Sequence, residues 1–126
     1  MAGRKRVFIA FAVEDSRYRD FLVGQARLKD SPFEFTDMSA KEPWDENWKT
    51  NCRSRIRGCH GVVALISKNT KNATGQLWEI QCAYDEGVPV MLMWINNDRP
   101  ALPALLKDRR INVWSWDNVS AFIVRL

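Results

Sequence analysis

Short apolar runs alternate along this chain with longer segments in which apolar residues recur at helical spacing. The runs comprise residues 6–12, 33–36, 61–66, 88–95 and 111–114. The first and third are apolar almost throughout, as expected of strands that are buried on both faces of a sheet. Strands that alternate with helices are joined in parallel by crossover connections. We therefore predict an α/β fold of the flavodoxin-like kind, with a five-stranded parallel sheet and helices on both faces.

Four helices are expected, each from an apolar stripe and a residue that can cap it. The first begins at Asp15 or Ser16, the second follows Asp45, the third runs from Thr74 to near Gly87, and the last runs from Asp117 to Leu126. The second helix has one apolar stripe and, beside it, a basic stripe that comprises Lys49, Arg53 and Arg57.

Length and composition are those of one ordinary globular domain, which we expect to span residues 1–126. The chain is 46% hydrophobic and 27% charged. No apolar run approaches the ~18 residues of a membrane span, and no signal segment precedes the first strand. We therefore expect a cytoplasmic protein without a membrane partner.

Three cysteines, Cys52, Cys59 and Cys82, cannot all pair, which also suits a reducing compartment. Cys52 and Cys59 are too far apart in sequence for the usual zinc-binding pair, even with His60 beside the second. We interpret all three as buried thiols and expect no metal and no bound cofactor. His60 is expected in the turn before the third strand.

Positive charge gathers between residues 47 and 78, where six basic residues occur without an acidic one; these are Lys49, Arg53, Arg55, Arg57, Lys68 and Lys71. Such a surface attracts anions, either a nucleotide or a phosphate backbone. A solvated helix face explains the pattern equally well.

Ligands on doubly wound sheets bind beyond the carboxyl ends of the strands. A phosphate-receiver domain would need an aspartate after the third strand, where this chain has Ser67 and Lys68. The common phosphate-binding loops are missing from the sequence, and a single histidine leaves little room for an activated nucleophile. Carboxylate chemistry remains, and the candidates are Glu14, Asp15, Asp37, Glu42 and Glu79.

Glu79 allows two interpretations. It could be a functional carboxylate near the carboxyl end of the third strand, or an exposed acid in the first turn of the third helix that complements the helix dipole. Helical spacing places it away from the apolar stripe of Leu77, Ile80 and Tyr84.

Several segments together resemble Toll/interleukin-1 receptor (TIR) domains. Residues 7–11 resemble the first conserved box, and residues 35–37 with the polar loop after them resemble the second strand and the BB loop. Residues 62–70, followed by Glu79 within residues 77–83, are similar to the third strand and the αC helix of prokaryotic TIR domains. The resemblance is greatest to the TIR-like family that includes the ThsB proteins of the Thoeris anti-phage system, and it covers the chain from about residue 6 to residue 126.

The resemblance implies an enzyme that consumes NAD as a substrate. In catalytic members of the superfamily a glutamate of the αC helix is required for cleaving the nicotinamide–ribose bond, and that position is Glu79. The expected product is an ADP-ribose-type nucleotide, cyclic in the Thoeris case, which activates a separate downstream effector. Phe11, Asp37, Ser67 and Trp78 are the expected substrate-binding residues, and we predict that Phe11, Asp37, Ser67 and Glu79 approach one cleft.

Two positions depart from the family pattern. Gly75 stands where a tryptophan often precedes the glutamate, so Trp78 would have to supply an aromatic wall. Ala12 and Val13 stand where some catalytic relatives carry basic residues, which leaves recognition of the pyrophosphate unassigned.

Two other functions compete with the enzyme. A non-catalytic TIR interaction module would self-associate through its BB loop, residues 37–43, and the basic face of its second helix. Nucleic-acid binding is a weaker alternative, because the basic stripe supports it but no recognisable binding module does.

Overall fold

The computed structural model describes residues 5–29, 34–36 and 46–126. Five strands form one sheet in the order β2-β1-β3-β4-β5, and every neighbouring pair is parallel. The strands are β1 (Arg6–Ala10), β2 (Glu34–Thr36), β3 (Gly61–Ile66), β4 (Val90–Trp94) and β5 (Ile111–Asn112). This confirms the predicted flavodoxin-like sheet.

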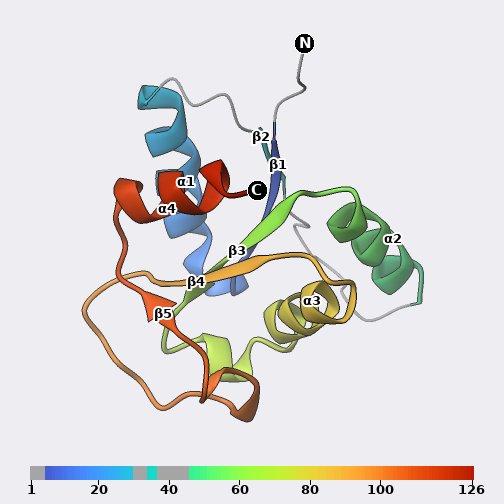
Figure 1. The fold of residues 1–126 in the computed structure, drawn as a ribbon. Coiled ribbons are helices and arrows are strands. Elements are labelled where there is room, and N and C mark those ends of the chain that lie inside the picture. Colours follow the sequence, from blue (N-terminus) through green and yellow to red (C-terminus); the bar gives the residue numbers. More distant parts are fainter. Residues whose placement is uncertain (1–4, 30–33, 37–45) are drawn as a thin grey trace.

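Helices cover both faces of the sheet (Figure 1). They are α1 (Ser16–Leu28), α2 (Glu46–Arg57), α3 (Thr74–Asp85) and α4 (Trp116–Val124), and short 3-10 turns occupy η1 (Val13–Asp15), η2 (Thr70–Asn72) and η3 (Ala104–Leu106). α1 and α4 lie on one face, and α2 and α3 lie on the other (Figure 1). Among the described helices, none is long and apolar enough to cross a membrane.

Side chains of the two central strands divide between two apolar clusters. From β1, Phe8 and Ala10 pack with α2 and α3, whereas Val7 and Ile9 pack with α1 and α4. All six residues of β3 are buried. The predicted central position of β1 and β3 is therefore confirmed, and the alternation follows from the period of two along a strand.

Two glycines are required by the backbone or by packing. Gly87 has φ of 70° just after α3, a conformation that glycine adopts without steric cost, and it ends the third helix where expected. A Cβ atom at Gly61 would lie 2.9 Å from Leu126, so the C-terminal residue packs directly over the start of β3. Lys5 Nζ also donates to the carbonyl of Leu126 at 3.1 Å.

Several predicted boundaries and caps are wrong. β1 ends at Ala10 rather than at residue 12, and β5 ends at Asn112 because only Ile111 and Asn112 pair with β4. Ser115, not Asp117, caps α4 by accepting from the amide of Asn118. The side chain of Asp15 does not cap α1, because other partners engage it. Asp45 and residues 33 and 37–43 lie outside the described residues.

Candidate functional site at the carboxyl ends of β1 and β3

The order of the strands reverses at β1, since the chain adds β2 on one side of it and β3 on the other. In sheets of this type the crevice beyond such a reversal is where ligands bind. Here the side-chain amide of Gln76 from α3 contacts the ends of β1 and β3. Gln76 Nε2 donates to the carbonyl of Ala10 at 3.0 Å and to the carbonyl of Leu65 at 2.6 Å.

Gln76 is only 2% exposed, and its Oε1 atom is buried without a hydrogen-bond partner. The two bonds of Nε2 fix the orientation of the amide, because an amide oxygen cannot donate to two carbonyls. The amide therefore attaches the first turns of α3 to the ends of β1 and β3, and so determines where the rest of this helix lies.

A second group of polar side chains connects the loops that follow β1 and β3. Asp15 is buried; one of its oxygens accepts from Ser67 Oγ at 2.5 Å and the other accepts from Asn69 Nδ2 at 2.9 Å. Ser67 Oγ accepts in turn from the amide of Asn69 at 2.9 Å, and Thr70 Oγ1 accepts from the amide of Ser67 at 3.0 Å. The donors on both sides compensate the burial of the Asp15 carboxylate.

Glu79 lies about one turn beyond Gln76 on α3 and is only 4% exposed. The thiol of Cys52 on α2 approaches its Oε2 atom at 3.8 Å as a weak donor. The interpretation of Glu79 as an exposed first-turn acid is therefore wrong. Glu79 belongs to the second turn of α3. Because α3 packs against both the sheet and α2, more of its circumference is buried than one apolar stripe would cover, and Glu79 lies in this buried part.

The cysteines are buried and free, as predicted. Burial in apolar surroundings, reinforced by the negative charge of Glu79, raises the pKa of Cys52 well above its usual range. Burial likewise raises the pKa of Cys59 to about 11 and raises the pKa of Cys82. Cys52 thus remains a protonated thiol that can donate to Glu79. Within the described ranges, no three His, Cys, Asp or Glu side chains form a group that could hold a metal ion.

Trp78 faces α2 beside this site. Its ring centroid lies 5.4 Å from that of Trp48 at an interplanar angle of 59°, and the guanidinium of Arg53 lies 5.4 Å from the same ring. Trp78 also lines a groove on the outer surface between α2 and α3, together with Thr50 and the basic stripe of α2. An aromatic ring therefore stands next to Glu79 in sequence, in contact with a second indole and with a cation.

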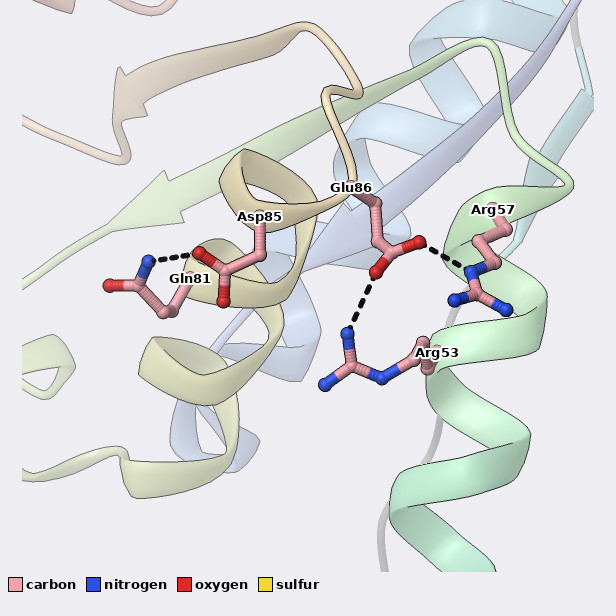
Figure 2. Close-up of polar contacts among 5 residues, drawn as sticks. All are labelled: Arg53, Arg57, Gln81, Asp85 and Glu86. Atoms are coloured by element: carbon pink, nitrogen blue, oxygen red, sulfur yellow. Dashed lines mark hydrogen bonds and ion pairs between the residues drawn. The ribbon is translucent and has the colours of Figure 1, made fainter.

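The basic stripe of α2 is partly neutralised by an acid from another element. Glu86, which follows α3, forms a bond with Arg53 at 2.9 Å and a second, short bond with Arg57 (Figure 2). The two arginines lower the pKa of Glu86, with the bond from Arg57 as the largest cause. Two of the six basic residues are thus paired in space with an acid that lies outside their run in the sequence. This pairing favours the interpretation as a helix face over that as a nucleic-acid surface.

The structure places the predicted site residues on two faces of the sheet. Glu79 and Trp78 lie on the α2–α3 side of the sheet, and Ser67 lies at the carboxyl end of β3. Phe11 packs with the α1–α4 cluster on the other face, where the guanidinium of Arg19 lies 5.4 Å from its ring. Asp37 lies outside the described residues. His60 is a turn residue, as predicted, and its Nδ1 atom accepts from the amide of Arg6 at 2.9 Å.

Sequence reasoning did not find Gln76 and Cys52 as parts of this site. A usable signal existed for Gln76, because it occupies the same helical face as Ile80 and Ala83, at spacings of four and seven residues. A long polar side chain on a buried face needs partners, and strand ends supply unpaired carbonyls. Cys52 carried no such signal, since a buried thiol fits any apolar stripe.

The arrangement offers one buried carboxylate with a weak donor on one oxygen, an adjacent aromatic ring, and a rigid frame from Gln76 and Asp15. A negative charge acts strongly where water is excluded. Such a group can stabilise a cation that develops on a bound molecule.

Comparison with solved structures shows the fold. The chain is similar to the TIR domain of the Toll-related receptor TRR-2 from Hydra magnipapillata, with a TM-score of 0.66 at 14% identity over 94% of this chain and 91% of that one. It is similar to a 2-deoxyribosyltransferase from Bacillus psychrosaccharolyticus, with a TM-score of 0.62 at 18% identity over 90% and 89% of the two chains. A prokaryotic SEFIR domain matches with a TM-score of 0.54 at 12% identity over 96% and 88%.

Comparison with protein families shows the family. No curated protein matches the chain. The family described as "Thoeris protein ThsB, TIR-like domain" matches residues 8–100, which include the end of β1, the Asp15–Ser67 pair, Gln76 and Glu79. The chain therefore belongs to the family of the TIR-like domain of the Thoeris protein ThsB.

Proposed function

We propose that this chain cleaves the bond between nicotinamide and ribose in NAD, with Glu79 as its catalytic carboxylate. Family membership supports a role in TIR-domain defence signalling. The reaction itself is our inference, and one observation carries it: the carboxylate of Glu79 is withdrawn from solvent to 4% exposure on the helix that follows β3.

The chemistry needs one carboxylate and no metal. Nicotinamide is positively charged in NAD, so it leaves with the electron pair of the C1–N bond and becomes neutral without a general acid. Positive charge then develops on ribose C1, as in glycoside hydrolysis. A carboxylate that interacts more strongly with this state than with bound NAD lowers the barrier.

The fate of the C1 cation determines the product. Attack by water, with release of its proton, gives ADP-ribose. Attack by a nucleophilic atom of the same nucleotide gives a cyclic product, which would serve as the signal to a separate effector. A buried site favours the second outcome, because it restricts the access of water to the reactive intermediate.

Other residues take supporting roles in this proposal. Trp78 would provide an aromatic surface for a ring of the nucleotide, and Ser67 would hold the loop after β3 through its bond to Asp15. Phe11 points to the opposite face of the sheet, so we assign it no contact with Glu79. Asp37 remains a candidate ligand to the substrate.

The fold is compatible with chemistry at a sugar carbon. One of the similar structures is a 2-deoxyribosyltransferase described as a biocatalyst for nucleoside synthesis. Its identity of 18% to this chain transfers only the fold. The likeness supports the proposal in one respect, because a fold of this kind carries a 2-deoxyribosyltransferase in that protein.

Incubation of the purified chain with NAD tests the proposed reaction. We expect release of nicotinamide in equal amount to NAD consumed, together with a nucleotide whose mass equals that of ADP-ribose or, for a cyclic product, that mass less one water. Consumption of NAD with nicotinamide still attached to the product would contradict the proposal.

A further inference from the structure

A hollow of about 740 Å³ lies at the edge of the sheet where β1 and β2 begin. The helices of a parallel α/β fold run back toward the amino ends of the strands, so the last turns of α1 and α2 both reach this region (Figure 1). Ser67 and Gln76 lie at the carboxyl ends of the strands, so the hollow is separate from the candidate site. Its volume is typical of sites for small molecules. The polar part of its lining comprises Arg6, Arg27, Glu34, Thr36, Ser54 and Arg55.

Three guanidinium groups from three separate elements border the hollow. Arg6 belongs to β1, Arg27 to the last turn of α1, and Arg55 to the last turn of α2. A Cβ atom at Gly58 would lie 3.8 Å from Nη1 of Arg6, so this guanidinium extends from the strand to the end of α2. Among the described residues of the lining, Glu34 alone is acidic. The hollow therefore has a surplus of two positive charges.

The dipoles of α1 and α2 account for only part of this pattern. A cation in the last turn of a helix is stabilised by the carbonyl end, which applies to Arg27 and Arg55. It does not apply to Arg6, which belongs to a strand. Arg6 pairs with Glu34, but the distance from Nε to Oε2 is 3.7 Å, and the two side chains are 52% and 51% exposed. Such a pair is weak, so an anion of higher charge can displace Glu34 from Arg6.

We propose that this hollow binds the phosphate group of a phosphomonoester of nucleotide size. A phosphomonoester carries about −1.5 to −2 charges at pH 7, which balances the surplus of the lining. Guanidinium groups donate to phosphate oxygens in pairs, and the hydroxyl groups of Thr36 and Ser54 supply further donors. The rest of the wall is apolar and would contact the organic part of the ligand; it comprises Val23, Ala26 and Phe35.

Isothermal titration calorimetry of the purified chain at low ionic strength tests this site with two probes, AMP and inorganic phosphate. Neither probe contains a bond between nicotinamide and ribose, so the outcome does not depend on the proposed reaction. We expect AMP to bind with a dissociation constant below about 1 mM and at least about fivefold more tightly than phosphate, because its organic part contacts the apolar wall. Added salt should weaken the binding of both probes. Equal affinity for the two probes would overturn the phosphomonoester and leave free phosphate as the ligand.

Charge-removing variants locate the binding. Arg27→Gln and Arg55→Gln should each raise the dissociation constant for AMP by roughly tenfold, because each removes a charge-assisted donor. Arg110→Gln removes the same charge from an exposed residue outside the lining, and its dissociation constant should stay within about twofold of wild type. Glu34→Gln should lower the dissociation constant by roughly threefold or more, because it removes the carboxylate that competes for Arg6.

Two results would overturn the site. One is the absence of saturable binding of either probe below ~1 mM. The other is equal affinity for AMP in wild type, Arg27→Gln and Arg55→Gln, which would leave these arginines with only the helix dipoles to stabilise. Melting curves of each variant show whether it folds. Because Glu34→Gln is expected to gain affinity, loss of the fold cannot imitate that result, and weaker binding by a folded Glu34→Gln would also contradict the proposal.

Discussion

Asp15 accepts a 2.5 Å hydrogen bond from Ser67, which lies 52 residues further along the chain. Asp15 ends the connection from β1 to α1, and Ser67 begins the loop that leaves β3. The order of the sheet reverses between these two strands. Asn69 adds a second bond to the same carboxylate. The pair therefore holds together the two loops that frame the candidate site.

A double-mutant cycle on Asp15 and Ser67 measures this connection. Asp15→Ala and Ser67→Ala should each destabilise the fold, and their coupling free energy should be about 1–3 kcal/mol because the bond is buried and charge-assisted. Urea denaturation of the two single variants and the double variant gives the value. Strictly additive effects would show that the bond contributes nothing beyond its separate groups.

Gln76→Leu should destabilise the fold by about 1–3 kcal/mol, because the carbonyls of Ala10 and Leu65 lose their shared donor inside the protein. Loss of the unpartnered Oε1 atom offsets part of this effect. Gln81→Leu is the matched control, since Gln81 is an exposed residue of the same helix, and its effect should stay within about 0.5 kcal/mol. Equal effects of the two substitutions in urea denaturation would show that the bonds of Gln76 are not needed to hold α3.

The thiols should be inert in the native chain. Because burial raises the pKa values of Cys52, Cys59 and Cys82, almost no thiolate is present at pH 8, and a disulfide reagent should react far faster after unfolding in guanidinium. Rapid labelling of the folded chain at that pH would contradict the burial of these residues.

The raised pKa of Cys59 also makes stability depend on pH. A thiol that ionises less readily when folded contributes stability below its unfolded pKa near 9.0, and this contribution is lost as pH rises toward its folded pKa of about 11. The melting temperature should therefore fall between pH 9 and pH 11. The melting temperature of Cys59→Ala should fall less steeply over this range than that of wild type. Identical slopes for the two proteins would show that ionisation of Cys59 does not contribute to the pH dependence of stability.

Much of the fold can be predicted from the sequence because several apolar residues mark each central strand and each helix. The run of residues 61–66 predicts β3 to the residue, since a six-residue apolar segment between the turn at residues 58–60 and the polar loop at residues 67–72 favours a buried strand. The buried stripe of Trp48, Cys52 and Ile56 in α2 is predicted equally well. Predictions of caps and strand ends are less accurate, because these features depend on tertiary partners. Ser67, for example, donates a hydrogen bond to Asp15, whose side chain therefore does not cap α1 as expected.

The candidate site could be predicted only in part, for a physical reason. Glu79 was identified as a candidate carboxylate, but its burial depends on how α3 packs against α2 as well as on the sheet, and helical spacing contains no information on a second packing partner. For the same reason Cys52 on α2 could not be assigned to Glu79. The sequence predicts Phe11 beside Glu79, yet Phe11, the residue after β1, packs with the α1–α4 cluster on the other face of the sheet.

NAD cleavage by Glu79→Gln, compared with wild type and with Glu86→Gln, tests the central claim most directly. Each substitution removes one carboxylate charge and preserves the size of the side chain. Glu79 lies within α3, whereas Glu86 directly follows this helix and pairs with Arg53 and Arg57 near the surface. We expect wild-type turnover from Glu86→Gln.

Glu79→Gln should lose about 10²–10³ in turnover, or roughly 3–4 kcal/mol of transition-state stabilisation. Its melting temperature should be unchanged or higher, because an amide is easier to bury than a carboxylate. Nicotinamide release by the three proteins under identical conditions, with melting curves run in parallel, gives the result. A collapse of turnover in Glu79→Gln alone, with the fold intact, is what this account predicts; equal turnover by Glu79→Gln and wild type would contradict it.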